Sequence, residues 1–391
     1  MKNKNLIDLQ ISLNNTCNLH CMYCVLNDNV KYHKKSSIKK TEDIKDKINL
    51  LINKILRSNY SIRDLTLIGA EPFVTSPKII GFFIKKMYEK FNLRNIYIIT
   101  NGTLLNEKYL KKFQKYLKEN NIPENRIMIR FSIDGVKSLH DKYRDNSYDL
   151  AMKNLFNMIS NTNFKISVIS NISPETFIQN NYNEFINFIN TMRNYNIIHF
   201  ISAIDFTIKK ISDVSLAKQD FANNFFVFIK KYNLYETLIK FFMRGYCYRE
   251  GSGCSKFLID ISDNKFYSCE KEYDKNKSLG TWEDKEFNDI VKCRLSLFNI
   301  QDDPQECKEC EYYDYCRNGC PLKRDENNKW ELCYLMKLFL DDFKNNGLNW
   351  KNEIIKINKK IIDKKLEEKD GTNNYNRTHD ISKENILRFD V

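Results

Sequence analysis

Three cysteines stand close together near the start of the chain, at Cys17, Cys21 and Cys24. Three thiolates in one short loop can each bind one iron of a cubane [4Fe–4S] cluster, which leaves the fourth iron open to an outside ligand. A set of four cysteines would instead predict a closed electron-transfer cluster or a zinc site. The spacing therefore favours a reactive iron–sulfur cluster, with a zinc knuckle as the alternative.

Nine further cysteines lie in the C-terminal part of the chain, and four of them form the pattern CxxCxxxxxCxxxC between Cys307 and Cys320. Twelve cysteines in a chain without a secretion signal indicate metal or redox chemistry rather than disulfides. A zinc ribbon made of the four clustered cysteines is one alternative, but it gives the remaining cysteines no role.

The composition predicts a globular chain without a membrane segment. The 391 residues suffice for one large α/β domain and a smaller one. No apolar stretch is long enough to cross a bilayer, and no apolar segment of signal-peptide type precedes Cys17. We therefore predict a cytoplasmic protein with no membrane partner.

The formal net charge of +13 raises the question of a nucleic-acid partner. The lysines are scattered over helical faces, as at Lys108, Lys111 and Lys115, and the whole chain is rich in lysine, asparagine and isoleucine. A solvated surface explains this pattern, so no nucleic-acid partner is expected. A basic surface that attracts an acidic peptide substrate is the alternative.

Apolar segments with β-branched residues alternate with amphipathic helical segments in the N-terminal part of the chain. Six such repeats predict a parallel sheet with right-handed crossovers, too small for a closed eight-stranded barrel. The expected fold class is thus α/β, a partial (β/α)6 TIM-like barrel. The expected strands are 8–13, 65–68, 95–100, 126–133, 165–170 and 197–206, and the expected helices lie near 44–55, 78–91, 106–118, 148–160 and 183–195.

Reactive groups of such a fold lie at the C-terminal ends of the strands. The loop with the three cysteines follows the first expected strand, and a glycine–proline turn beginning at Gly69 follows the second. Asn101 ends the third strand, and Ser132 ends the fourth with Arg144 further on. Such polar groups and a guanidinium suit ribose hydroxyls and a carboxylate.

The cysteine spacing, with Tyr23 before the last cysteine, resembles the signature of the radical S-adenosylmethionine (SAM) superfamily. The resemblance implies that the open iron binds SAM and that the reduced cluster cleaves SAM to a 5′-deoxyadenosyl radical. It implies SAM contacts for two sets of residues. One set resembles the GGEP motif that holds the SAM amino group, at Gly69, Ala70, Glu71 and Pro72. The other predicted SAM-binding residues are Tyr23, Asn101, Ser132 and Arg144. Ala70 replaces a glycine of that motif, which is tolerated if its φ stays negative.

Residues 245–334 resemble the SPASM domain, an extension with auxiliary iron–sulfur clusters. The resemblance implies two auxiliary [4Fe–4S] clusters and so three clusters in all. Cluster I would be held by Cys247, Cys254, Cys269 and Cys320, and cluster II by Cys307, Cys310, Cys316 and Cys333. If Cys247 is not a ligand, cluster I keeps an open iron for a substrate cysteine. Cys293 is left as a buried, unligated thiol.

The expected domains are therefore a radical SAM core at 1–244, a SPASM domain at 245–334 and a helical, partly disordered tail at 335–391. Helical periodicity is lost from about Gly245, where two short strand-like pieces flank a turn at Asn264. Asparagine in place of the usual glycine keeps that turn, because asparagine tolerates a positive φ.

The same resemblance predicts an enzyme that modifies peptides. Sulfatase maturases carry an aspartate after the cysteine that matches Cys269, and Glu270 takes that place as the candidate proton acceptor. The residues around it, Gly253 and Cys254 together with the run from Phe266 to Lys271, look more like those of maturases of cysteine-rich ribosomal peptides. The main prediction is a radical SAM oxidoreductase that abstracts a hydrogen atom from a precursor peptide and forms a thioether or C–C crosslink. The alternatives are an anaerobic sulfatase-maturating enzyme that oxidises Cys or Ser to formylglycine, and a non-enzymatic iron–sulfur electron-transfer or scaffold protein.

Two kinds of partner follow from this prediction. An external reductant such as flavodoxin or ferredoxin would supply electrons. Because only sixteen residues precede Cys17, recognition of a leader peptide is expected to come from a separate leader-binding protein, from the tail or from the basic surface.

Overall fold

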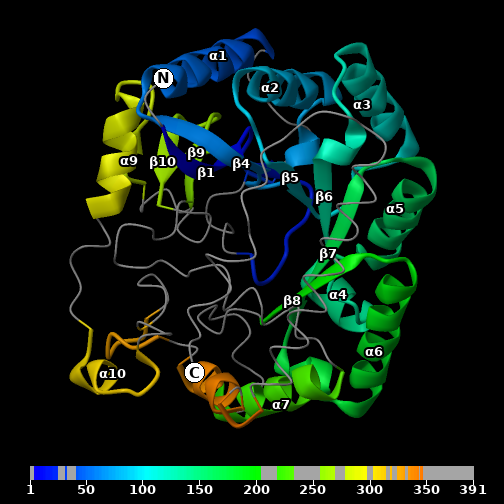
Figure 1. Cartoon of the computed structure of the whole chain (residues 1–391). Coiled ribbons are helices and arrows are strands. Elements are labelled where there is room, and N and C mark those ends of the chain that lie inside the picture. Colours follow the sequence, from blue (N-terminus) through cyan, green and yellow to red (C-terminus); the bar gives the residue numbers. More distant parts are fainter. Residues whose placement is uncertain are drawn as a thin grey trace. The chain divides into compact units, whose positions relative to one another are not determined.

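Two compact units make up the chain in the computed structural model (Figure 1), one from residues 1–215 with 255–301 and one from 216–254 with 302–391. The structure describes residues 4–24, 31–32, 41–203, 218–232, 256–268, 278–296, 303–313, 318, 324–330, 333–342 and 344–346. In this part of the chain no helix is long and apolar enough to span a membrane. The predictions for Glu270, for the tail beyond 346 and for Cys247, Cys254, Cys269, Cys316 and Cys320 lie outside it.

A sheet with the strand order β11-β10-β9-β1-β4-β5-β6-β7-β8 forms the centre of the first unit. The run from β1 to β8 is parallel at every step. Its strands are β1 (Asn5–Ser12), β4 (Tyr60–Leu67), β5 (Asn95–Thr100), β6 (Ile127–Ser132), β7 (Lys165–Ile172) and β8 (Ile198–Ala203). These are the six predicted strands, and the α/β partial-barrel fold is confirmed. A separate pair joins β2 (Thr16–Cys17) to β3 (Lys31–Tyr32).

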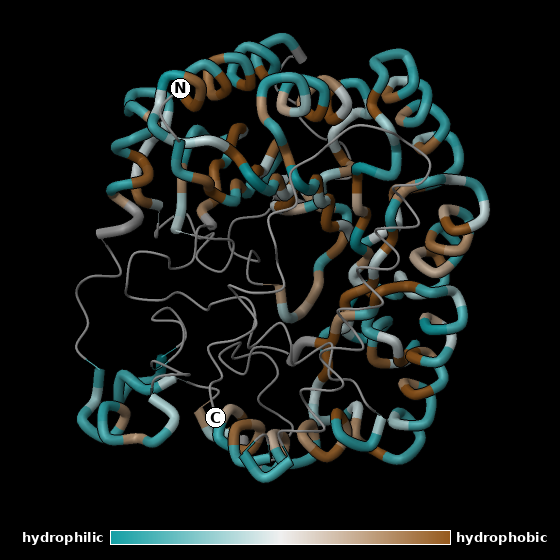
Figure 2. Tube along the Cα trace, viewed as in Figure 1, coloured by the Kyte–Doolittle hydropathy of each residue, from teal (hydrophilic) through white to brown (hydrophobic). Residues whose placement is uncertain are grey.

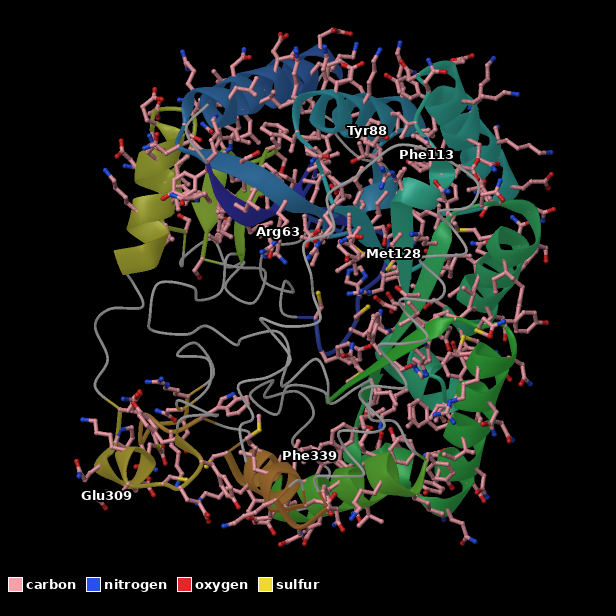
Figure 3. All side chains as sticks on the ribbon, viewed as in Figure 1. Arg63, Tyr88, Phe113, Met128, Glu309 and Phe339 are labelled. Carbon is pink, nitrogen blue, oxygen red and sulfur yellow. The ribbon has the colours of Figure 1, made fainter. Side chains whose placement is uncertain are left out.

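Helices cover the outer face of this sheet, as Figure 1 shows. They are α1 (Thr41–Arg57), α2 (Pro77–Lys90), α3 (Glu107–Glu119), α4 (Lys137–Tyr143), α5 (Tyr148–Asn161) and α6 (Gln179–Asn194), with 3-10 turns η1 (Pro72–Val74), η2 (Glu124–Arg126) and η3 (Pro174–Phe177). The apolar face expected in α1 is buried, with Ile48, Leu51 and Ile55 fully covered. Figure 2 shows the same alternation of apolar and polar residues along the other helices. Phe113 of α3 (Figure 3) stacks on Phe164 with ring centroids 5.7 Å apart.

A short antiparallel hairpin from the second half of the chain extends the sheet beyond β1. Its strands are β9 (Lys256–Asp260), which pairs in parallel with β1, and β10 (Lys265–Tyr267), followed by β11 (Gly280–Thr281). Asn264 at its turn has a φ of 60°, as the sequence predicts. The domain boundaries at 244 and 334 stay a prediction.

The loss of helical periodicity predicted from about Gly245 is wrong for one segment. Helix α9 (Phe287–Ser296) follows the hairpin and buries Phe287, Ile290 and Val291. Its apolar side chains are few and close together, so their spacing is a weak signal, and contact with the rest of the first unit stabilises the helix instead.

Among its described residues, the second unit contains α7 (Lys218–Lys231), α10 (Gln305–Lys308) and helical segments over 333–342 and 344–346. The segment over 333–342 agrees with the predicted helical start of the tail. It packs on α7 through Phe339 and Phe226, whose ring centroids are 5.2 Å apart. A buried ion pair of 3.1 Å between Arg324 and Asp303 holds the loops of this unit together.

Candidate functional site

The loop that carries the three cysteines begins at the C-terminal end of β1, at the same edge of the sheet as the other motifs. Its first part is tied to the turn after β4. The Asn14 side chain donates to the carbonyl of Glu71 at 3.1 Å and to Thr75 Oγ1 at 2.8 Å, and the Glu71 amide donates to the Thr16 carbonyl at 3.1 Å. The loop and the turn therefore hold each other in place.

Gly69 allows this close approach. Its φ of +125° is a conformation that favours glycine, and a Cβ at this position would lie 2.3 Å from Ser12 Oγ. The neighbouring Ala70 does not have a positive φ, as its replacement of glycine requires. Pro72 opens the short helix η1.

Glu71 is a buried carboxylate between two strand ends. It accepts hydrogen bonds from the Phe73 amide at 3.0 Å, the Thr100 hydroxyl at 2.8 Å and the Asn101 amide at 2.8 Å. Burial raises the pKa of Glu71 to about 7, although these hydrogen bonds lower it. The carboxylate thus fixes the turn after β4 against the end of β5.

Asn101 carries the contact on to the cysteine loop. Its side chain donates to Asn18 Oδ1 at 3.0 Å and lies 3.8 Å from the sulfur of Cys17, and Asn18 in turn donates to Thr103 Oγ1 at 2.8 Å. The Leu19 amide donates to the same sulfur at 3.4 Å. Two N–H groups thus point at the Cys17 thiol, an arrangement that stabilises a thiolate.

The second part of the loop is held by the segment after α4. The Met22 amide donates to the Tyr143 carbonyl at 2.9 Å, and the His20 amide donates to Asp145 Oδ2. Between these contacts, the Arg144 guanidinium lies 5.0 Å from the ring centroid of Tyr23.

A buried trio of side chains underlies this contact. The Tyr23 hydroxyl donates to Asp134 Oδ2 at 2.5 Å, Arg144 Nε lies 3.0 Å from the same oxygen, and Arg144 Nε also contacts the Tyr23 hydroxyl. Asp134 and Arg144 are 4% and 6% exposed, so the ion pair is shielded from water. Ser132, also predicted to contact SAM, is half-buried at the end of β6.

The hairpin β9–β10 holds the third side of the loop. The side-chain Nδ2 of Asn15 donates to both carboxylate oxygens of Asp263 at 3.0 Å, and Cys24 packs against the buried pair Leu258 and Tyr267. The segment that leads to the predicted ligand Cys269 therefore begins beside Cys24.

The three thiols fit an iron–sulfur cluster. The pKa of Cys17 is raised to about 12 and that of Cys21 to about 11, mainly by burial and in part by the neighbouring thiols. Thiols in such surroundings ionise when a metal binds them. No three His, Cys, Asp or Glu side chains of the described segments are arranged to enclose a single metal ion, and thiols that bind separate irons of one cluster need no such arrangement.

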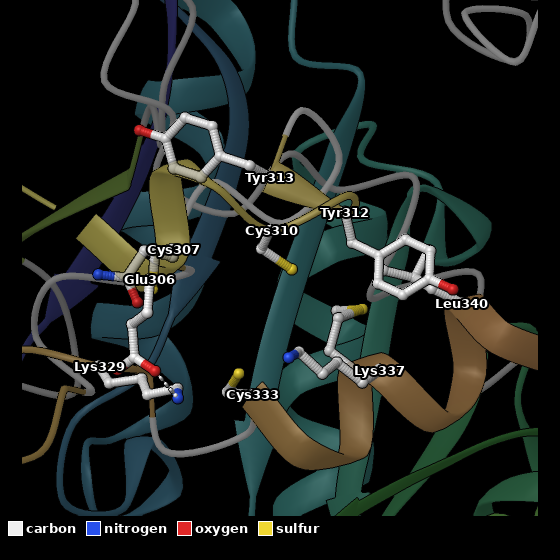
Figure 4. A pocket seen from close by; sticks show the side chains of 11 residues that line it. Glu306, Cys307, Cys310, Tyr312, Tyr313, Lys329, Cys333, Lys337 and Leu340 are labelled. Atoms are coloured by element: carbon white, nitrogen blue, oxygen red, sulfur yellow. Dashed lines mark hydrogen bonds and ion pairs between the residues drawn. The ribbon is translucent and has the colours of Figure 1, made fainter. Parts of the chain in front are cut away.

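Three cysteines of the second unit line one small cavity of about 40 Å³, shown in Figure 4. They are Cys307, Cys310 and Cys333, three of the four ligands predicted for auxiliary cluster II. Lys329, paired with Glu306 at 2.8 Å, lines the same cavity. The structure therefore brings together these three cysteines, and they stay predicted ligands.

Cys293 differs from its prediction. It lies on α9 in the first unit and is half-buried, whereas the sequence predicted a buried thiol. Its position toward the C-terminal end of a short helix leaves part of the side chain at the surface.

Several residues that hold the site together were not predicted to take part, among them Asn14, Asn18, Asp134 and Asp145. Asp134 follows Ser132 closely and could be taken for part of an ordinary turn with Gly135. The one signal that could have found it is the nearby Arg144, a cation that needs a partner when it is buried.

The chain is similar to known proteins over most of its length. The model of the radical SAM superfamily matches residues 11–177. A cysteine-type anaerobic sulfatase-maturating enzyme of Clostridium novyi (strain NT) is 27% identical over 351 residues, which cover 80% of this chain and 86% of that protein. The radical SAM cyclopropyl synthase TigE of Paramaledivibacter caminithermalis (strain DSM 15212 / CIP 107654 / DViRD3) is 27% identical over 219 residues, 53% of this chain and 43% of that protein.

A solved structure has the same fold. Native anSMEcpe with bound AdoMet matches with a TM-score of 0.63 and 17% identity, over 89% of this chain and 98% of that one. The match to the superfamily model covers the cysteine loop, the turn after β4 and the ends of β5 and β6, but not the hairpin β9–β10.

Proposed function

Because this chain carries a radical SAM domain and is a radical SAM enzyme, we propose that it oxidises a peptide or protein substrate at a cysteine-containing segment. The observation that carries the proposal is the loop with three neighbouring thiols, clamped on three sides at the C-terminal edge of the sheet. When bound, the cluster and SAM supply an electron and a 5′-deoxyadenosyl radical that takes a hydrogen atom from the substrate.

The protein side chains have separate tasks in this proposal. Cys17, Cys21 and Cys24 hold the cluster, and the N–H groups around Cys17 stabilise its thiolate. Glu71 keeps the turn after β4 in position, so that its backbone can receive the SAM amino group. The Arg144 guanidinium provides a buried positive charge for the SAM carboxylate.

The remaining predicted contacts belong to the same proposal. Tyr23, Ser132 and Asn101 surround the SAM position, and Glu270 acts as the proton acceptor in the chemical step. Two auxiliary clusters, with Cys307, Cys310 and Cys333 among the ligands of cluster II, would take up the electron that the substrate radical loses, while the abstracted hydrogen atom ends in 5′-deoxyadenosine. A reductant such as flavodoxin or ferredoxin and a separate leader-binding protein are the partners proposed with it.

Two substrate classes are compatible with this site. The first is a ribosomally made precursor peptide that receives a thioether or C–C crosslink, and the similarity to a cyclopropyl synthase, an enzyme named for ring formation, supports it. The second is a sulfatase whose cysteine or serine becomes formylglycine, and the similarity to sulfatase-maturating enzymes supports it. Neither similarity outweighs the other, so the product decides between them.

The proposal is tested first without a peptide. Anaerobically reconstituted protein is reduced in the presence of SAM, and 5′-deoxyadenosine is measured by chromatography. We expect wild type and Cys293→Ala to form it, and the triple variant of Cys17, Cys21 and Cys24 to form none while still folding. Equal yields from wild type and the triple variant would refute the radical SAM site in this loop.

The product is then read by mass spectrometry on two peptide sets. A crosslink removes two hydrogens from the peptide and keeps its sulfur. Formylglycine formation from cysteine replaces the sulfur by oxygen and removes two hydrogens. A cysteine-rich precursor and a peptide with a sulfatase-type cysteine are compared, and failure of both while 5′-deoxyadenosine forms would overturn the proposed substrate class.

A further inference from the structure

We infer that Asp134 is a positioning residue of this site, which fixes the Arg144 guanidinium and the Tyr23 ring against the cysteine loop and thereby sets how tightly SAM is held. The inference rests on the proposed function, because it concerns SAM. It goes beyond that proposal in giving Asp134 a role, since the cysteine loop, Tyr23 and Arg144 were already expected to take part.

The Asp134 carboxylate has donors on both oxygens. Oδ2 accepts from the Tyr23 hydroxyl at 2.5 Å and lies 3.0 Å from Arg144 Nε, while Oδ1 accepts from the Asn171 amide at 3.1 Å. Tyr23 comes from the cysteine loop, Asn171 from β7 and Arg144 from the segment after α4. One carboxylate therefore joins three separate parts of the chain.

Only a carboxylate satisfies this arrangement. Three donors point at its two oxygens, and an asparagine at the same place would direct its own NH₂ group at one of them. The ion pair is buried, so water cannot replace the lost acceptor. The substitution Asp134→Asn therefore changes the position of Arg144 while it keeps the size of the side chain.

The backbone around Arg144 is held in the same way. The Asp134 amide donates to His140 Nδ1 at 3.2 Å, so the other ring nitrogen of His140 donates to Ser147 Oγ at 3.0 Å. The Ser147 hydroxyl donates to the Arg144 carbonyl at 2.6 Å. The backbone at residue 134 is thus linked through His140 and Ser147 to the Arg144 main chain, and because Asp134→Asn keeps this link, that substitution tests the side-chain contacts alone.

This arrangement leaves part of the guanidinium for a ligand. Among the described residues, the hydrogen bonds and the ion pair given above use Arg144 Nε, and the terminal amino groups of the guanidinium are outside the clamp. A guanidinium held by one edge presents its remaining donors in a fixed direction, which suits a carboxylate. The amino-acid carboxylate of SAM is the ligand that this chemistry would recognise.

The test compares Asp134→Asn with Asp149→Asn, the same substitution at an exposed carboxylate that pairs with Lys137. Iron content, the EPR spectrum of the reduced protein with and without SAM, and the SAM dissociation constant are measured on reconstituted protein. We expect both variants to keep the iron of wild type. Asp134→Asn should bind SAM on the order of tenfold to a hundredfold more weakly, the effect of one lost charge-assisted contact, and its EPR spectrum should respond less to SAM.

Wild-type affinity and an unchanged EPR response in Asp134→Asn would overturn the inference. If Asp134→Asn does not fold, Asp134→Glu takes its place, because it keeps the ion pair but displaces Arg144 by the length of one methylene. Weaker SAM binding in that variant supports the positioning role, and wild-type binding rejects it. If wild type itself neither binds SAM nor changes its EPR spectrum, the proposed function fails instead.

Discussion

Glu71 and His140 are buried groups whose pKa values shift in opposite directions. Burial raises the pKa of Glu71 from 4.5 to about 7 and lowers that of His140 from 6.5 to about 4. Folded Glu71 binds its proton more tightly than the unfolded chain does, so its contribution to stability is lost as the pH rises from 4.5 to about 7. Folded His140 binds its proton less tightly, so its contribution is lost as the pH falls from 6.5 to about 4.

The pH-dependent contributions of Glu71 and His140 to the unfolding free energy nearly cancel in wild type. Substituting one of the two residues reveals the contribution of each. Between about pH 5 and about pH 8 the contribution of Glu71 falls by about 2.5 kcal/mol, and that of His140 rises by about 2 kcal/mol. Relative to wild type, Glu71→Gln should therefore gain stability with rising pH, and His140→Asn should lose it. Both variants also carry a pH-independent cost from lost hydrogen bonds, about 1–3 kcal/mol.

The assay is urea unfolding under anaerobic conditions across this pH range, followed by tryptophan fluorescence. The difference in unfolding free energy between variant and wild type isolates each group, because all other titrations are shared. Glu119→Gln, the same substitution at an exposed carboxylate at the end of α3, is the matched control. Curves of Glu71→Gln and His140→Asn that run parallel to wild type would refute the reasoning.

Three further predictions concern geometry. Gly69→Ala, at a φ of +125° and with its Cβ 2.3 Å from a serine hydroxyl, should lower the unfolding free energy by about 1–3 kcal/mol in urea titrations. Asn101→Ala removes an N–H group beside the Cys17 sulfur, so iron release to a chelator should be roughly tenfold faster, and an unchanged rate would contradict it. Arg324→Met removes the buried ion pair between Arg324 and Asp303 and should destabilise the second unit by about 3–5 kcal/mol. The double variant with Asp303→Asn should recover part of that loss.

Much of the fold follows from local patterns. The six parallel strands and the apolar face of α1 were predictable, because strands and amphipathic helices repeat their buried positions at fixed intervals. The hairpin β9–β10 was predicted as two short strands, but not as part of the first sheet. Its pairing with β1 joins segments far apart in the chain, and no periodicity within either segment records that contact.

The same division holds for the site. The spacing of Cys17, Cys21 and Cys24 is a local property, so the sequence alone determined the cluster chemistry that this loop can support. Only the tertiary structure decided what surrounds the loop, since the partners of Tyr23 come from the segment after β6 and from the segment after α4. Asp134 looks like a turn residue in the sequence, and it becomes the buried partner of Arg144 only when the two lie 3.0 Å apart in the fold. Burial, which makes that charge pair consequential, is a property of the packed structure and of no single segment.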